Sequence, residues 1–96
     1  MTTVICLCRV ADYDTWRPRY DDAVDMFDDV LTAQVLRGQD DPNLVAIIET
    51  FESREIAERL WTAPEVEEAM INDGVDLASL RVEYVEDVGA AGRAKA

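Results

Sequence analysis

Residues 3–11 and 44–51 both read as β-strands that are apolar on both faces, and no other feature constrains the fold as much. Successive side chains of a strand point to opposite sides of its sheet, so Cys6 and Leu7 face opposite sides. A strand with one wet side would alternate apolar and polar residues instead. We therefore expect both strands to lie at the centre of a sheet that is covered on both faces.

Two further strands, at 30–37 and 80–87, alternate more with polar residues and are expected at the sheet edges. Glycine, aspartate, proline and asparagine between residues 38 and 43 are typical turn residues. The sequence thus predicts a β-hairpin that joins 30–37 to 44–51.

A first helix is expected to begin near Asp14 or Thr15, because either side chain can cap a helix and Pro18 is tolerated only in or near the first turn. Its apolar residues recur at helical spacing and should pack on the sheet. They are Trp16, Tyr20, Ala23, Val24 and Phe27.

A second helical segment follows Ser53, which can cap it. The pair Ala63-Pro64 interrupts this segment, and Pro64 is suited to the first position of a restarted helix. Gly74 is a suitable residue at its C-terminal end.

This order of elements predicts a ferredoxin-like βαββαβ fold of the α+β class, with an antiparallel four-stranded sheet and the helices on one face. We expect a single domain over residues 1–88 and a flexible tail over 89–96, where glycine and alanine prevail. The uncovered sheet face would be an apolar patch of a size that monomers rarely expose. The sequence therefore predicts a homodimer through the open sheet face.

The composition is strongly acidic, with 21 aspartates and glutamates against 9 lysines and arginines and a formal charge of −12. Such a chain repels nucleic acid and anionic lipid, so neither is an expected partner. A solvated surface is the ordinary interpretation, and a salt-rich cytoplasm would suit it too. No apolar run is long enough to span a membrane, and no secretory signal is visible, so we expect a cytoplasmic protein.

The chain has no histidine, which removes histidine-based relays, haem ligation by histidine and most zinc sites. Cys6 and Cys8 share one face of a strand and are expected to be small buried hydrophobic residues. Aspartates such as Asp25 and Asp28 could hold a divalent cation, but a hydrated helix face explains them as well. We expect no metal and no cofactor.

Four aromatic residues are the candidate ligand-binding residues: Trp16, Tyr20, Trp61 and Tyr84. They converge between the helices and the sheet, where they could line a pocket for a flat ligand. Residues at this spacing are more often plain core, and both interpretations stay open. Arg9 is a further candidate, either as an anchor for an anionic ligand or in an ion pair at the rim of the sheet.

Several segments resemble small dimeric α+β barrel proteins of the antibiotic-biosynthesis-monooxygenase-like superfamily. These segments are Asp12-Tyr13-Asp14-Thr15-Trp16, residues 40–45, residues 49–53, Trp61-Thr62-Ala63-Pro64-Glu65, Ala69-Met70 and Gly74-Val75. The superfamily includes cofactor-independent oxygenases of aromatic polyketides, haem-degrading enzymes and polyketide cyclases, as well as proteins without known activity. Fold likeness alone does not choose among them.

The resemblance places Trp61 at the position of a functional tryptophan of the oxygenases. The histidine of the haem-degrading branch is missing, since that region reads Glu68-Ala69-Met70-Ile71, and so is the histidine of the cyclases. The leading hypothesis is a homodimer that binds a small aromatic molecule and acts as a monooxygenase or cyclase. The alternative is a non-catalytic accessory dimer whose aromatic residues are core packing.

Overall fold

The computed structural model describes residues 1–92 and shows a ferredoxin-like α+β fold, as predicted. Four strands form one antiparallel sheet, and three helices accompany it. The elements are β1 (Thr2–Val10), α1 (Tyr13–Met26), β2 (Thr32–Arg37), β3 (Leu44–Phe51), α2 (Arg54–Trp61), α3 (Pro64–Asn72) and β4 (Val75–Val85).

The strand order is β2-β3-β1-β4, so the two strands that are apolar on both faces do occupy the centre. Cys6 of β1 lies opposite Ile47 of β3 and Val82 of β4, which fixes the register across the sheet. The hairpin between β2 and β3 turns at Gly38, where a Cβ atom would collide with the backbone oxygen of Asp41. The central position of β1 and β3 agrees with the prediction from their apolar residues on both faces.

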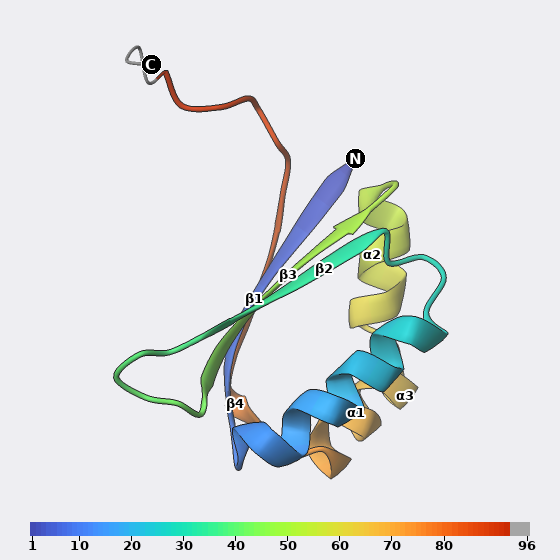
Figure 1. The fold of residues 1–96 in the computed structure, drawn as a ribbon. Helices are drawn as coiled ribbons and strands as arrows, with labels where there is room; N and C mark the ends of the chain where they lie inside the picture. The colour runs from blue at the N-terminus through green and yellow to red at the C-terminus, as the bar shows by residue number, and fades with distance from the viewer. Residues whose placement is uncertain (93–96) are drawn as a thin grey trace.

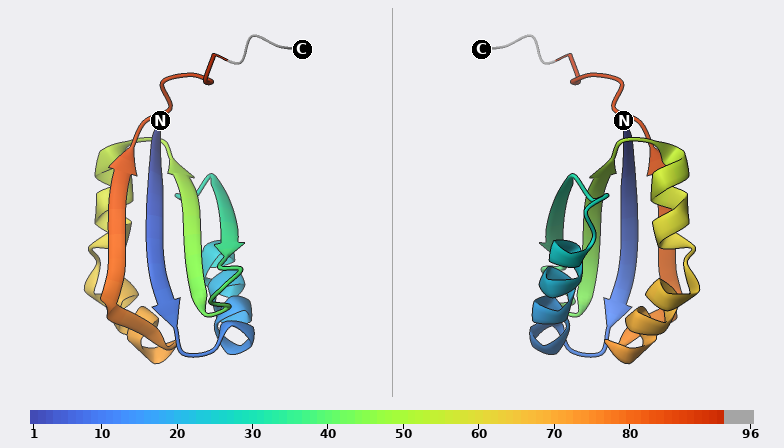
Figure 2. Two further views of the ribbon diagram at one scale, coloured as in Figure 1. Left: turned by 90° about the vertical axis from the view of Figure 1, so that its left-hand side faces the viewer. Right: turned by 90° about the vertical axis from the view of Figure 1, so that its right-hand side faces the viewer.

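All three helices lie on one side of the sheet, and the other side is uncovered (Figure 1). Figure 2 shows this open face in its left-hand view, with the four strands in front of the helices. The core lies between the helices and the sheet. Its buried apolar residues are Val4, Cys6, Cys8, Val10, Trp16, Val45, Ile47, Phe51 and Ala57.

The start of the first helix differs from the expectation of Asp14 or Thr15, because α1 begins at Tyr13 and is capped by Asp12. The Asp12 carboxylate accepts hydrogen bonds from the backbone N–H of Thr15 at 3.0 Å and from its hydroxyl at 2.7 Å. Pro18 consequently lies inside the helix rather than in its first turn. Both Asp12 and Asp14 have a side chain that can cap a helix. Asp12 is the cap here, and its carboxylate accepts a second hydrogen bond from the Thr15 hydroxyl.

The second helical segment has the predicted form, with Ser53 as the cap of α2 and Pro64 as the first residue of α3. Gly74 follows the end of α3 with a positive φ of 88°, a conformation that favours glycine. The backbone N–H of Ala11 donates to the oxygen of Gly74 at 2.8 Å, which joins this turn to the end of β1.

Strand boundaries differ from the expectation by one residue at each end of β1, by two residues at the end of β4, and at the two points that follow. Strand β4 begins at Val75 instead of Leu80, because Asp76 and Val75 already pair with the end of β1 before the register shifts. Strand β2 begins at Thr32 instead of Val30. Residues 86–92 form no helix or strand, and residues 93–96 of the predicted tail lie outside the described residues. Within residues 1–92, no helix is long and apolar enough to cross a membrane.

Candidate functional site

A cavity of about 220 Å³ lies between the inner face of the sheet and the helices. Its floor includes Cys6, Cys8 and Ile47 from the central strands, and its walls are mostly apolar side chains of all three helices. Two acidic residues also line it, exposed Glu65 at the start of α3 and half-buried Asp73 just after that helix. The Asp73 carboxylate is paired with the guanidinium of Arg19 at 3.4 Å.

The polar centre of the cavity is Glu49, whose side chain points inward from β3 and is only 3% exposed. The Tyr20 hydroxyl of α1 donates a hydrogen bond to Oε2 of Glu49 at 2.6 Å. The indole Nε1–H of Trp61, at the end of α2, donates to Oε1 at 3.0 Å. One carboxylate thus joins the sheet to two helices across the cavity.

Glu49 has no cationic partner among residues 1–92, since none of their ion pairs includes it. Burial raises the pKa of the Glu49 carboxyl above its ordinary value of 4.5, while the hydrogen bonds from Tyr20 and Trp61 act in the opposite direction. Burial and the nearby Glu49 carboxylate also raise the pKa of the Tyr20 hydroxyl. Tyr20 therefore stays a neutral hydrogen-bond donor over the physiological pH range.

Three of the predicted binding residues meet at this cavity: Trp16, Tyr20 and Trp61 all line it. The rings of Trp16 and Tyr20 are stacked, with centroids 5.0 Å apart and an interplanar angle of 18°. Trp16 is buried, whereas Tyr20 and Trp61 are half-buried. The stack makes a flat, rigid wall, a suitable surface for a planar ligand.

The structure does not bring Tyr84 to the cavity, although its position between helices and sheet was predicted. Tyr84 packs against the cluster of Val4, Phe51 and Ala57 at the other end of the core. The guanidinium of Arg54 lies over the Tyr84 ring at 5.1 Å.

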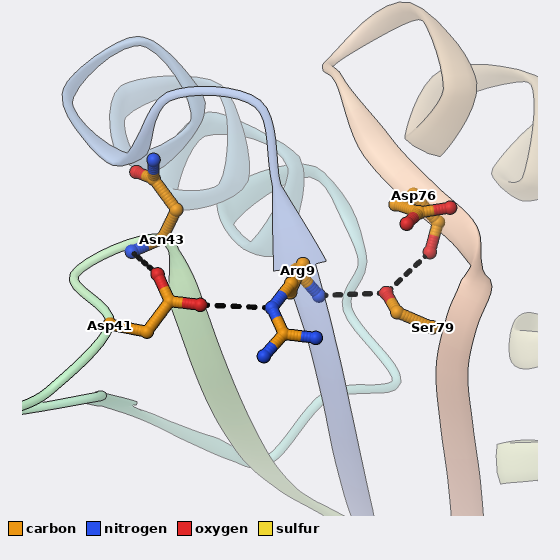
Figure 3. Close-up of polar contacts among 5 residues, drawn as sticks. All are labelled: Arg9, Asp41, Asn43, Asp76 and Ser79. Atoms are coloured by element: carbon orange, nitrogen blue, oxygen red, sulfur yellow. Dashed lines mark hydrogen bonds and ion pairs between the residues drawn. The ribbon is translucent and has the colours of Figure 1, made fainter.

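Arg9 lies on the open face of the sheet, away from the cavity, as strand alternation from Cys8 requires. Its Nε is 2.9 Å from Oδ2 of Asp41, which corresponds to the rim ion pair that the sequence left open (Figure 3). Asp41 also accepts from the backbone N–H of Asn43, and the Arg9 backbone N–H donates to the Ser79 hydroxyl. The Arg9 guanidinium, together with that N–H of Asn43, lowers the pKa of the Asp41 carboxyl.

The cysteines are free and buried, as expected, and both face the cavity. Interaction with Cys8 and burial raise the pKa of the Cys6 thiol, so this thiol stays protonated. Within residues 1–92, no group of three or more cysteine, aspartate or glutamate side chains is arranged to hold a metal ion.

Sequence reasoning missed Glu49, although a signal for it was present. Val45 and Ile47 face inward on β3, so period-two alternation also turns Glu49 inward. A carboxylate at a core position of a central strand is costly unless it is hydrogen-bonded, and it marks a functional candidate.

Comparison with solved structures places this fold among those of antibiotic biosynthesis monooxygenases. A proposed enzyme of this kind from Chloroflexus aurantiacus has 20% sequence identity and a TM-score of 0.70 over 95% of this chain and 96% of its own. A proposed one from Deinococcus radiodurans has 16% identity and a TM-score of 0.67, over 99% and 100% of the two chains.

The N63A variant of SnoaB, a cofactor-independent oxygenase from Streptomyces nogalater, has 10% identity and a TM-score of 0.73, over 96% of this chain and 97% of its own. No model of a protein family matches the sequence, and a comparison with curated proteins finds no match either. The predicted resemblance to the antibiotic-biosynthesis-monooxygenase-like superfamily is thus confirmed at the level of the fold.

Proposed function

We propose that this protein binds a small, flat, mostly apolar molecule in the cavity and acts on it as a cofactor-independent monooxygenase. The observation that carries this proposal is the cavity of about 220 Å³ with an aromatic wall and one polar centre, Glu49 with Tyr20 and Trp61. Apolar walls with a few convergent polar groups are typical of small-molecule sites. The SnoaB fold likeness supports the choice of reaction class.

In the proposed reaction, a CH2 group activated by a neighbouring carbonyl reacts with O2 to give a second C=O group and one water molecule. The electrons for O2 reduction come from the substrate carbanion, so the protein has to orient the substrate and exclude water around it. The stacked rings of Trp16 and Tyr20 would hold a planar substrate against the sheet.

We also propose that two copies associate through the open sheet face. On this face Ile5 and Leu7 of β1 are 40% and 42% exposed, although they occupy the centre of the sheet. Leu36 of β2 is exposed as well, and Ala46 and Ile48 of β3 lie between these strands with the same orientation. A second copy would cover this apolar centre most simply, since the same surface serves both partners.

Titration with anthrone, a neutral planar molecule with an activated CH2 group, tests the binding proposal. Tryptophan fluorescence should change saturably, and most of this change should be lost in the Trp61→Phe variant. Oxygen uptake in the presence of anthrone should exceed the rate in buffer. Binding and oxygen uptake that are both absent would contradict the proposal and favour the non-catalytic accessory dimer.

A further inference from the structure

We propose that Glu49 is the proton acceptor of the cavity and that it serves a neutral carbon acid or oxygen acid, such as an anthrone, a phenol or a 1,3-diketone. This inference rests on the proposed function. It adds to that function a proton-transfer step for Glu49 and a preference of the cavity for neutral over anionic ligands.

Glu49 has the geometry of an acceptor with free capacity. Its two oxygens each receive one hydrogen bond, from Tyr20 and from Trp61, and a carboxylate oxygen can accept two. The two donors come from different helices and fix the plane of the carboxylate from two sides. The Glu49 side chain lines the cavity, so a bound ligand can reach the remaining lone pairs.

The charges around the cavity favour a neutral ligand. The lining contributed by residues 1–92 includes no arginine or lysine, and Arg19, which lies beside the lining residue Asp73, is already paired with that carboxylate at 3.4 Å. An anionic ligand in the cavity would lie beside the carboxylate of Glu49, which is only 3% exposed, so the two like charges would repel each other with little solvent screening. A neutral ligand with an acidic hydrogen avoids this repulsion and can donate a hydrogen bond to Glu49.

The chemical step is a proton transfer. A carboxylate oxygen of Glu49 forms an O–H bond with the acidic hydrogen, and the C–H or O–H bond pair stays on the ligand as an enolate or phenolate. Glu49 becomes neutral, so it attracts the Tyr20 and Trp61 donors less strongly. Those two donors are then available to the new negative charge of the ligand, which makes them positioning residues for both states.

The test is hydrogen–deuterium exchange at the CH2 group of anthrone, measured in D2O without oxygen by mass spectrometry. The wild-type protein should accelerate exchange above the buffer rate, and Glu49→Gln should reduce this acceleration at least about 100-fold, as expected for loss of a general base. Gln keeps the size of the side chain and can still accept from Trp61. The affinity of the Glu49→Gln variant for anthrone, measured by tryptophan fluorescence, should differ from that of the wild type by less than about threefold. Glu52→Gln, with the same change of charge at an exposed position next to β3, should match the wild type.

The pH profile gives a second readout. Exchange should rise with pH through an apparent pKa above 4.5, because the ionised carboxylate is the active form and burial raises its pKa. The other titratable groups that line the cavity are Tyr20 on α1, Cys6 and Cys8 on β1, and Glu65 and Asp73 at the two ends of α3. Tyr20→Phe removes a hydrogen bond that lowers the Glu49 pKa, so its profile should move to higher pH.

The outcomes separate this inference from the proposed function. Anthrone binding without accelerated exchange, or full exchange in Glu49→Gln, would overturn the role of Glu49 and leave the binding site in place. Absence of anthrone binding would overturn both. A carboxylated anthrone should bind at least about tenfold more weakly than anthrone, and equal affinity would overturn the charge selection.

Discussion

The two faces of the sheet are built from the same strands but have opposite surroundings. On the helix side, β1 and β3 present buried residues and a cavity with one hydrogen-bonded carboxylate. On the open side, the same strands present Ile5 and Leu7, which are about two-fifths exposed. The covered face thus holds the core and the cavity, whereas the open face is the surface that we propose for association with a second copy.

The strongest test of the covered face is Trp16→Ala. Trp16 is 3% exposed and stacks on Tyr20, so its removal leaves a large void. The free energy of unfolding should fall by about 3–5 kcal/mol, as for other buried tryptophans. Chemical denaturation followed by circular dichroism measures this change. Trp16→Phe, which retains an aromatic ring, should lose clearly less, and equal losses would mean that the stacked wall is not well packed.

The matching test of the open face is the double variant Ile5→Asp, Leu7→Asp. Two charges at the centre of the proposed interface should weaken self-association at least about 100-fold, or about 2.8 kcal/mol. Sedimentation velocity should show the wild type at twice its chain mass of 10.8 kDa and the variant at the chain mass. Anthrone binding should persist in the variant. A wild type that is monomeric at high concentration would refute the assignment of this face.

The pH dependence of stability sharpens the comparison further. The folded-state pKa of Glu49 is raised, so its contribution to stability is fully present below the unfolded value near 4.5 and is lost as pH rises through the folded value. Glu49→Gln lacks this loss. The melting temperature of Glu49→Gln minus that of the wild type should therefore increase from pH 4 to pH 8. Glu52→Gln, with the same change of charge at an exposed position, is the matched control, and a rise equal to that of Glu49→Gln would contradict the role of burial.

The smallest effect is expected for Arg9→Gln on the open face. Arg9 and Asp41 form an exposed ion pair, with 58% and 38% of their side chains accessible, and such pairs contribute little. The melting temperature and the anthrone affinity should both remain at the wild-type values. A loss of affinity would show that the two faces are coupled through β1.

The sequence was sufficient where a pattern had one physical solution. The bounds of β3 agree because turn residues precede it at 38–43 and Ser53, the cap of the next helix, follows it closely. The start of α1 did not follow, because Asp12 and Asp14 are equally good caps and only the bonds to Thr15 separate them. The early start of β4 was missed because its first residues pair with β1 through an irregular register that no local pattern reveals.

The candidate site was predictable in part. Helical spacing predicts that Trp16 and Tyr20 face the sheet, and Trp61 of the second helical segment lines the same cavity. Their shared partner Glu49 lies 29 and 12 residues from Tyr20 and Trp61, and such pairings depend on the assembled sheet. Alternation along β3 alone would have turned Glu49 toward the core, but it does not supply the two donors.

The bifacial nature of β1 also determines how this strand should tolerate mutation. Polar substitutions at Val4, Cys6 and Cys8 should reduce the folded fraction at every protein concentration, because these residues belong to the core. Polar substitutions at Ile5 and Leu7 should act mainly through the proposed dimer, so their effect should depend on the protein concentration and hence on expression level. In a saturation mutagenesis scan at two expression levels, the effect of substitution should depend on the level at every second residue of β1. In β2, Val35 is half-buried and Leu36 belongs to the proposed interface, so the other positions should tolerate substitution at both levels.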